Sequence, residues 1–404
     1  AVPIYQTTSY EFDSTEHAEN LFQLSELGNI YTRIMNPTND ILEKRVAAID
    51  NGVGALAVAS GQAASLYSIQ NICVAGDNFV CSEHLYGGTW NLFKNTLKDM
   101  GIEARFVNPS DPNNFRAATD EKTRAYYAET LPNPSFEVFP IGEVAEIGKE
   151  LGVPLIVDNT AAPVLCRPFD HGAAITIYSA TKFIGGHGTT IGGLLVDSGN
   201  FNWETHSDRF PKLNKPDPNY HGVVWTEAAK ALGPIAYLLK ARVTLLRDSG
   251  AAMSPFNAFQ FIQGLETLPL RMERHCENAV AVAAFLSNHP KITRVIHPSV
   301  QEGTAKINAD KYLINGFGSL MGIELEGGKK SGQKLIDNLE LFYHVANIGD
   351  ARSLAIHPAT TTHSQLDDQE LLAAGVTPGY VRLSIGIENI EDIVSDLEQA
   401  LAKV

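Results

Sequence analysis

The sequence predicts an α/β fold with a mostly parallel sheet and a smaller second domain. From about residue 54 to residue 200, short apolar runs alternate with segments of helical periodicity, as in strands joined by helical crossovers. Beyond about residue 266 the order of elements changes, which predicts a separate α+β unit. A length of 404 residues with 44% hydrophobic residues allows a sizeable core and two or three domains.

Short apolar runs mark the candidate strands of the main sheet. They lie at residues 55–59, 78–81, 104–107, 125–128, 155–157, 176–178 and 194–196. Between two of them, residues 141–151 have a helical pattern that stops at Gly152, a residue typical of helix C-termini. We therefore expect a largely parallel sheet covered by helices.

The segments that flank this sheet have different characters. The first 38 residues show little regular periodicity, so we predict an extended arm, which is costly to order unless it packs on a partner subunit. Residues 198–220 are too long and too rich in proline for a sheet crossover, and we interpret them as a functional insertion. Two or more long helices are expected to follow.

The C-terminal part is predicted to form the smaller domain. Its pattern indicates a helix, a strand at residues 316–325, a helix from Ser331, a strand at residues 380–385 and a final helix. The predicted units are an N-terminal arm (1–38), a large cofactor-binding domain (39–265) and a C-terminal α+β domain (266–404).

Charge and cysteine content argue against several classes of function. The net charge of −15 opposes binding to nucleic acid or to an anionic membrane. No stretch approaches the length of a membrane span, and the start lacks the features of a secretory signal, so we expect a cytoplasmic protein. The four cysteines have no two-residue spacing, so neither a metal site nor a disulfide framework is expected.

The tetrapeptide at residues 179–182 ends in Lys182, which could carry an aldehyde cofactor such as pyridoxal phosphate. It stands between an apolar run and a glycine cluster. A free lysine has a pKa of about 10.4, so a Schiff-base lysine needs burial or a cationic neighbour that lowers it. The end of a strand permits such burial. The alternative, a surface lysine, is favoured when the lysine is considered alone.

Asp158 is the second candidate for cofactor binding. It closes the apolar run before it, at the C-terminal end of a predicted parallel strand, where open α/β sheets bind ligands. Its carboxylate could pair with a pyridine nitrogen and so make the ring an electron sink. The alternative is an N-cap or turn aspartate.

Two further segments could contact a cofactor. Ser60, Gly61 and Gln62 open a helical pattern after a strand, so they could receive a phosphate, although a plain serine N-cap is the alternative. No GxGxxG pattern accompanies a strand, which argues against a dinucleotide site. Tyr86 stands on a glycine-rich turn and could stack on a flat ring, or could be an ordinary turn tyrosine.

Three residues could bind substrate or a neighbouring subunit. Arg382 interrupts an apolar strand and needs an anionic partner, either a substrate carboxylate or a structural ion-pair partner. Tyr31 and Arg33 lie on the arm and could complete a neighbour's active site. Their spacing alone favours a solvated surface pair.

Taken together, these segments resemble the Cys/Met-metabolism family of pyridoxal-phosphate enzymes, which has the type I (aspartate-aminotransferase-like) fold. The resemblance covers nearly the whole chain. It looks closest to the O-acetylhomoserine sulfhydrylase branch of that family, on the strength of residues 29–38, 179–193, 218–224 and 349–354.

The resemblance implies a role for each matching residue. Lys182 would hold the cofactor covalently, Asp158 would pair with the ring nitrogen, and Tyr86 would stack on the ring. The residues implied around the phosphate are Ser60, Gly61, Gln62, Ser179 and Thr181, with Tyr31 and Arg33 from the adjacent subunit. Asn133 would lie beside the phenolic oxygen, and Arg382 and Ser353 would hold the substrate carboxylate. An obligate dimer, usually paired into a tetramer, is also implied.

The implied reaction is γ-replacement on O-acetyl-L-homoserine by sulfide or methanethiol, which belongs to methionine biosynthesis. Methionine γ-lyases of the family place a cysteine where Gly88 stands, so the glycine favours synthesis over breakdown. The alternatives are γ-elimination, replacement by another thiol or a carbon nucleophile as in cystathionine synthases, and a cofactor-binding scaffold without catalysis.

Overall fold

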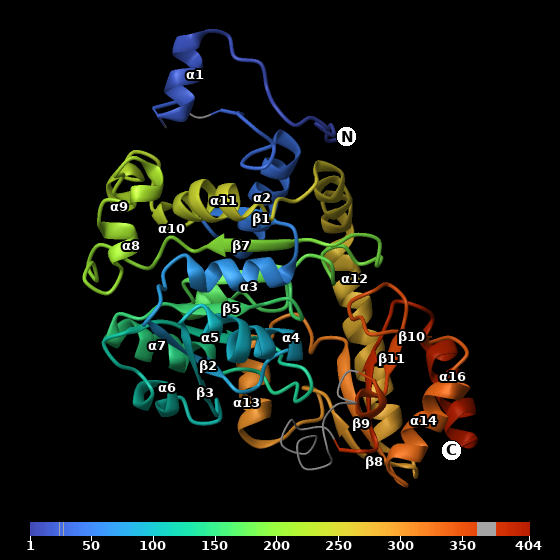
Figure 1. The fold of residues 1–404 in the computed structure, drawn as a ribbon. Helices are drawn as coiled ribbons and strands as arrows, with labels where there is room; N and C mark the ends of the chain where they lie inside the picture. The colour runs from blue at the N-terminus through green and yellow to red at the C-terminus, as the bar shows by residue number, and fades with distance from the viewer. Residues whose placement is uncertain (24, 27, 362–376) are drawn as a thin grey trace.

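A seven-stranded sheet forms the centre of the larger part of the molecule in the computed structural model, which describes residues 1–23, 25–26, 28–361 and 377–404 (Figure 1). Its strands are β1 (Gly54–Val58), β2 (Asn78–Ser82), β3 (Glu103–Val107), β4 (Thr123–Glu129), β5 (Leu155–Asp158), β6 (Ile175–Ser179) and β7 (Gly193–Asp197). The spatial order is β1-β7-β6-β5-β4-β2-β3, and β7 is antiparallel to both of its neighbours. All other pairings are parallel, so the mostly parallel sheet is confirmed.

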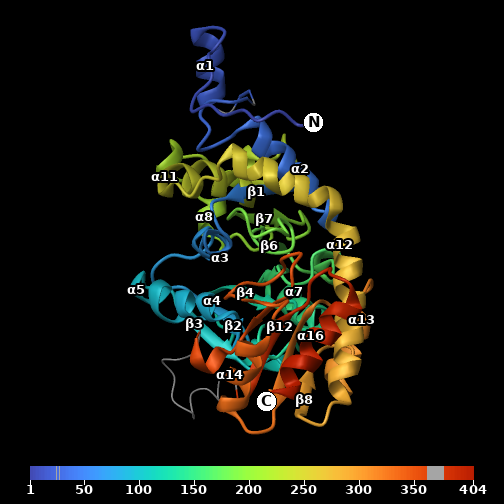
Figure 2. The same cartoon turned by 90° about the vertical axis from the view of Figure 1, so that its right-hand side faces the viewer.

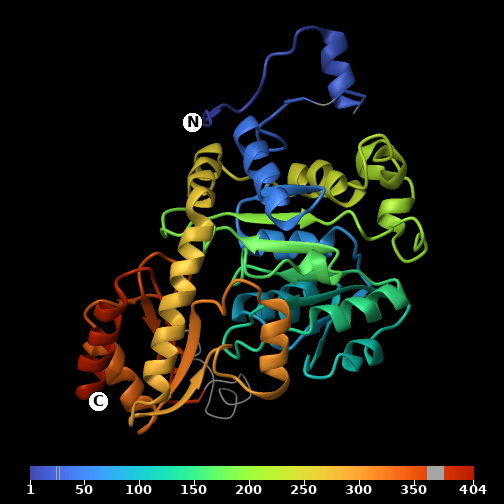
Figure 3. The same cartoon turned by 180° about the vertical axis from the view of Figure 1, so that it is seen from behind.

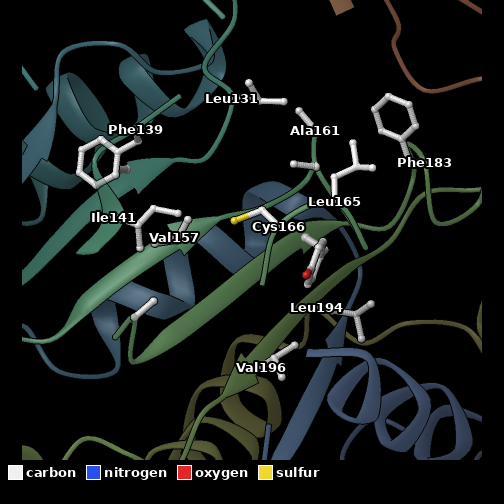
Figure 4. Packing of buried hydrophobic residues seen from close by; sticks show 14 of the residues in the cluster. Leu131, Phe139, Ile141, Val157, Ala161, Leu165, Cys166, Phe183, Leu194 and Val196 are labelled. Carbon is white, nitrogen blue, oxygen red and sulfur yellow. The ribbon is translucent and has the colours of Figure 1, made fainter. Parts of the chain in front are cut away.

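Successive residues of the central strands enter different apolar clusters, because side chains alternate between the two faces of a strand. Leu155 and Val157 of β5 pack in one cluster, whereas Ile156 packs in the other. Figure 4 shows Val157 with Leu194 and Val196 in the first cluster. Both faces of the sheet are therefore buried, which explains why the strands are apolar runs without polar alternation.

Helical segments precede or connect the strands of the main sheet. They are α2 (Pro37–Asp50), α3 (Gly61–Gln70), α4 (Gly87–Asn91), η1 (Leu92–Thr96), α5 (Leu97–Asp99), α6 (Asn113–Ala117), α7 (Ile141–Leu151) and the short η2 (Pro168–His171). Helix α7 has the predicted bounds and ends at Gly152, whose φ of 68° is left-handed. Glycine adopts this conformation without steric cost, which is why it ends the helix.

The predicted insertion contains only short helices. It includes α8 (Pro211–Asn214) and η3 (Pro218–Tyr220), and it is followed by α9 (Trp225–Ala228). A continuous helical run then comprises α10 (Ala236–Lys240), the π-helical η4 (Ala241–Leu246) and α11 (Arg247–Ser249). The 33-residue α12 (Pro255–Ser287) completes this part and runs along the side of the molecule (Figures 2 and 3).

A second sheet with the spatial order β10-β11-β12-β9-β8 lies in the C-terminal part. Its strands are β8 (Ile292–Ile296), β9 (Leu320–Leu325), β10 (Tyr343–His344), β11 (Leu354–Ile356) and β12 (Tyr380–Ser384), and the helical elements beside them are α13 (Gly303–Tyr312), α14 (Lys329–Asn338), η5 (Pro358–Thr360) and α16 (Ile390–Ala402). The strand predicted at residues 316–325 begins only at Leu320. Gly316 and Gly318 have φ values of 133° and 83°, which turn the chain before the strand.

Helix α12 passes through both parts of the fold. Phe261 and Leu268 in its first half pack in a cluster with the main sheet, while Val282 and Leu286 pack with the second sheet. The predicted domain boundary between residues 265 and 266 falls inside this helix. The division into an arm and two domains stays a prediction.

The arm contains a helix that the sequence prediction missed, α1 (Thr15–Phe22), which lies apart from the main body (Figures 1 and 2). The Oγ of Ser14 caps it by accepting a hydrogen bond from the His17 N–H at 3.0 Å. Leu21 is the one buried residue of this eight-residue helix, so little of it packs on the rest of the chain. None of the helices in the described ranges has the length and apolar character needed to cross a bilayer.

Candidate active site

Lys182 lies in a tight turn directly after β6. The turn is closed by hydrogen bonds from the Lys182 N–H to the Ser179 carbonyl at 3.1 Å and from the Gly185 N–H to the Ala180 carbonyl at 2.8 Å. Arg271 of α12 fastens it from outside, because its guanidinium donates to the carbonyls of Phe183 and Ile184 at 2.7 and 3.3 Å. The position of the lysine therefore depends on a helix far away in the sequence.

The amine of Lys182 is partly buried and has a side-chain partner in Asn347. Its Nζ donates to Oδ1 of Asn347 at 2.5 Å. Burial, and secondly the charge of Arg382, lower the pKa of Lys182 to about 8. A substantial fraction of the amine is neutral near physiological pH, as a nucleophile and proton acceptor requires. Lys182 is thus not a solvated surface lysine.

Arg382 lies in the centre of β12 and is 9% exposed. Its Nη2 donates to the main-chain carbonyl of Asn347 at 3.0 Å. Within residues 1–361 and 377–404, as far as they are described, Arg382 forms no ion pair with a carboxylate, so a structural salt bridge does not explain its burial. A buried guanidinium of this kind is suited to a carboxylate ligand.

Asn347 connects the two cationic groups, since its side chain accepts from Lys182 and its carbonyl accepts from Arg382. Sequence reasoning missed this residue. The available signal was its position, two residues before the segment 349–354 that carried the family resemblance.

Two carboxyl groups meet at the ends of neighbouring strands. Asp158 of β5 and Glu129 of β4 are paired in the sheet register. Oδ1 of Asp158 accepts from the Thr160 N–H at 2.9 Å, and Oε1 of Glu129 accepts from the Tyr86 N–H at 2.6 Å. Burial raises the pKa of both carboxyls, and the neighbouring Asp158 raises that of Glu129 further.

Neither carboxyl forms an ion pair with a lysine, arginine or histidine of the described residues. Such a buried acidic pair favours a ligand that brings a positively charged N–H, for example a protonated pyridine nitrogen. Glu129 was not predicted, although it ends an apolar run just as Asp158 does.

The N-terminus of α3 lies against the end of β6. Oγ of Ser60 caps the helix by accepting from the Ala63 N–H at 3.1 Å. A Cβ at Gly61 would lie 2.6 Å from Cβ of Ser179, so only glycine allows this close approach. The first N–H groups of a ten-residue helix are thereby brought beside the lysine turn, an arrangement that fits a phosphate.

The other residues predicted around the phosphate lie nearby. The Ser179 N–H donates to Oγ1 of Thr160 at 2.7 Å, which joins the end of β6 to the residues after β5. Oγ1 of Thr181 accepts from the Gly192 N–H at 3.1 Å. Ser179 is therefore held by the segment that follows Asp158, and Thr181 by the residue that precedes β7.

Tyr86 stands at the start of α4 with 54% of its surface exposed. A Cβ at Gly88 would lie 2.5 Å from Cε1 of Tyr86 and 2.9 Å from Nε2 of Gln62, so the tyrosine ring and the glutamine adjoin each other. Asn133 is half-buried and follows β4, four residues after Glu129. Both Tyr86 and Asn133 thus belong to the strand ends at which the acidic pair lies.

The sequence model of the family described as Cys/Met metabolism PLP-dependent enzymes matches residues 1–402. The chain belongs to this family. It is 54% identical to an O-acetyl-L-homoserine sulfhydrylase of Leptospira meyeri, over 100% of this chain and 92% of the relative. It is 49% identical to a homocysteine synthase of Schizosaccharomyces pombe, over 99% and 93% of the two chains.

A solved structure has the same fold, with a TM-score of 0.95 and 40% identity over 100% of this chain and 95% of that one. It is described as an O-acetylhomoserine (thiol)-lyase from Campylobacter jejuni with N'-pyridoxyl-lysine-5'-monophosphate. The predicted type I fold and the predicted cofactor, pyridoxal 5'-phosphate, are both confirmed. In this chain Lys182, Asp158 and the N-terminus of α3 are the groups that fit its aldehyde, ring nitrogen and phosphate.

Ser353, implied by the family resemblance as a ligand of the substrate carboxylate, is bonded within the chain in this structure. It is fully buried, and its Oγ donates to Glu388 at 2.9 Å and accepts from the Gly386 N–H at 2.9 Å. Its own N–H donates to Oε1 of Glu388 at 2.6 Å. These bonds occupy both donors of Ser353, and its contact with the substrate carboxylate stays a prediction.

Tyr31 and Arg33 are not brought to Lys182 within one chain. The guanidinium of Arg33 lies 5.4 Å from the ring centroid of Tyr31 and donates to the main-chain carbonyl of Arg247. Both residues stay on the arm. Their contact with the phosphate site of an adjacent subunit stays a prediction.

Proposed function

We propose that this enzyme replaces the acetoxy group of O-acetyl-L-homoserine with sulfide, giving L-homocysteine and acetate, and that methanethiol in place of sulfide gives methionine. The observation that carries this proposal is the junction at Asn347, which joins a lysine amine of lowered pKa to a buried arginine that has no ion pair among the described residues. An α-amino acid presents a carboxylate to the arginine and its Cα proton to the lysine. The names of the relatives support the acetylated homoserine as the substrate.

Bound pyridoxal 5'-phosphate supplies an electron sink for negative charge that develops next to the substrate amino group. Arg382 binds the α-carboxylate and thereby orients Cα. Lys182, with a pKa of about 8, removes the Cα proton, assists proton loss at Cβ and returns protons after the exchange. At Cγ the carbon–oxygen bond breaks and acetate leaves with its electron pair. Hydrosulfide then forms the carbon–sulfur bond at Cγ.

Product analysis with and without sulfide tests this proposal. Incubation of the purified enzyme with O-acetylhomoserine and sulfide should give homocysteine and acetate in equal amounts. Formation of 2-oxobutanoate and ammonia at the same rate with or without sulfide would instead identify a γ-lyase. O-succinyl- and O-phosphohomoserine serve as matched substrates, and the acetyl ester is expected to react fastest.

Lys182→Ala should abolish both turnover and the chromophore that borohydride reduces. The amine is the group that can bind the cofactor aldehyde and move the Cα proton. Absorbance spectra before and after borohydride, together with product analysis, check this. Retention of both properties would contradict the assignment of Lys182.

We also propose that the enzyme is a cytoplasmic dimer of dimers whose active sites are shared between subunits. The arm supports this proposal, because it extends from the body and exposes the apolar side chains of Tyr5, Phe22 and Tyr31. An exposed apolar arm of this kind suits burial against another copy of the chain.

A further inference from the structure

Glu129 is a buried carboxyl group that the proposed reaction leaves without a role. It is 8% exposed and ends β4, beside Asp158. Its side chain accepts the main-chain N–H of Tyr86 at 2.6 Å. A buried acid that binds a main-chain donor 43 residues away joins two separate segments of the fold.

The turn before α4 depends on this hydrogen bond at its last residue. Earlier in the turn, the Glu83 N–H is bound by the Val107 carbonyl and the His84 N–H by Oγ of Ser82. Leu85 is buried in an apolar cluster, whereas Tyr86 after it is 54% exposed, so packing holds Leu85 and the bond to Glu129 holds the main chain of Tyr86. The hydrogen bond to Glu129 therefore connects the start of α4 to the C-terminal end of β4.

Glu129 acts as a hydrogen-bond acceptor toward the main chain of Tyr86. Burial and the adjacent Asp158 raise its pKa well above the usual range, and the Tyr86 N–H opposes them only in part. Tyr127 is a further titratable group in this pocket. Its pKa is raised by burial and by the two acids, Asp158 and Glu129. A protonated glutamic acid still accepts through its carbonyl oxygen, as a glutamine amide does.

We propose that Glu129 is a positioning residue that anchors the Tyr86 turn to the sheet, and so places the tyrosine that stacks on the cofactor ring. This proposal rests on the cofactor assignment made above. The proposed role depends on side-chain length. The glutamate is long enough to accept the hydrogen bond from the Tyr86 N–H, and an aspartate is one methylene shorter.

Two variants separate the effect of side-chain length at residue 129 from the effect of its charge. Glu129→Asp keeps the carboxyl group but shortens it, whereas Glu129→Gln keeps the length and an acceptor oxygen but cannot ionise. Affinity of the apoenzyme is measured for pyridoxal 5'-phosphate and for its analogue without a ring nitrogen. Glu129→Asp should weaken binding of both ligands by about tenfold, the effect of one lost hydrogen bond, and Glu129→Gln should restore most of that loss.

A double-mutant cycle with Tyr86→Ala shows whether the effect passes through the tyrosine. We expect Glu129→Asp to cause little further loss of cofactor affinity once Tyr86 has been removed. Three results would overturn the proposal. The first is weaker cofactor binding by Glu129→Gln than by Glu129→Asp, and the second is additive losses in the cycle. The third is a loss of affinity confined to the cofactor that contains the ring nitrogen. Cofactor affinity needs no turnover, so an enzyme inactive toward O-acetylhomoserine would refute the proposed reaction and leave this result standing.

Discussion

The amine of Lys182 lies between groups that move its pKa in opposite directions. Burial and the nearby charge of Arg382 disfavour the ammonium form and lower the pKa to about 8. The hydrogen bond to Oδ1 of Asn347 should favour the ammonium form, because an ammonium N–H is a stronger donor to an amide oxygen than the N–H of a neutral amine. The reactive state of the lysine is therefore set by two residues that lie in the C-terminal part of the chain.

Substitutions at these two residues should shift the titration of Lys182 in opposite directions. Arg382→Gln removes a positive charge and should raise the pKa, whereas Asn347→Ala removes an acceptor and should lower it. The pH dependence of the rate at which apoenzyme captures pyridoxal 5'-phosphate reports this pKa, since the neutral amine reacts. The wild-type midpoint is expected near the lysine pKa of about 8. Shifts of the same sign in both variants would contradict this account.

At the scale of elements, the contact between α3 and β6 builds the phosphate end of the site. The backbone of α3 approaches so closely that a Cβ at Gly61 would lie 2.9 Å from Cα of Ser179. A main-chain atom cannot move aside as a flexible side chain can. The glycine is required by the neighbouring strand and not by its own backbone conformation.

Gly61→Ala should therefore separate α3 from β6. We expect a loss of about 1–3 kcal/mol in the free energy of unfolding, the usual cost of overpacking, together with weaker cofactor binding. Gly87→Ala is the matched control, because a Cβ at Gly87 has nothing within 4 Å. Urea denaturation and cofactor titration check both variants, and equal effects would refute the steric explanation.

Helix α12 holds the lysine turn through Arg271, which is 5% exposed and donates to three main-chain carbonyls. Arg271→Met leaves these carbonyls unsatisfied, so stability should fall by about 2–3 kcal/mol. Arg274→Met on the same helix removes only an exposed pair with Glu277 and should cost less than about 1 kcal/mol. Urea denaturation of both variants is the measurement. Similar losses would show that Arg271 contributes no special anchoring.

At the scale of the whole molecule, residues on the arm bear on whether one chain can form a complete site. Tyr31 and Arg33 lie away from Lys182 within a single chain, and the proposed assembly gives them a role in a neighbour. An isologous dimer would then contain two sites, each built from both subunits.

Mixing two inactive variants tests this arrangement. A chain with Tyr31→Ala and Arg33→Ala lacks the arm residues, and a Lys182→Ala chain lacks the amine, but a mixed dimer keeps one intact site. After the subunits exchange, we expect about a quarter of wild-type activity from random pairing. Sedimentation of each variant alone confirms that assembly is unchanged. An inactive mixture that has formed mixed dimers would refute the shared site.

The sequence alone determined the strands, the sheet type and the residues at the strand ends. Runs such as residues 155–157 are apolar because both faces of the sheet are buried, and this pattern is local. Asp158 could be found because it directly follows such a run, and Lys182 because it stands a few residues beyond another run, before a glycine cluster. Parallel strands bring their C-terminal ends to one edge, so strand position alone predicted a shared site.

Only the tertiary structure decided which side chains meet. Asn347 reaches Lys182 across 165 residues, and Ser353 is bound by Glu388. These contacts depend on how the second sheet and α12 pack against the first, which no local pattern records. The hydrophobic periodicity that predicts an element constrains its buried face, whereas the partner of each polar side chain is fixed by the packing of distant elements.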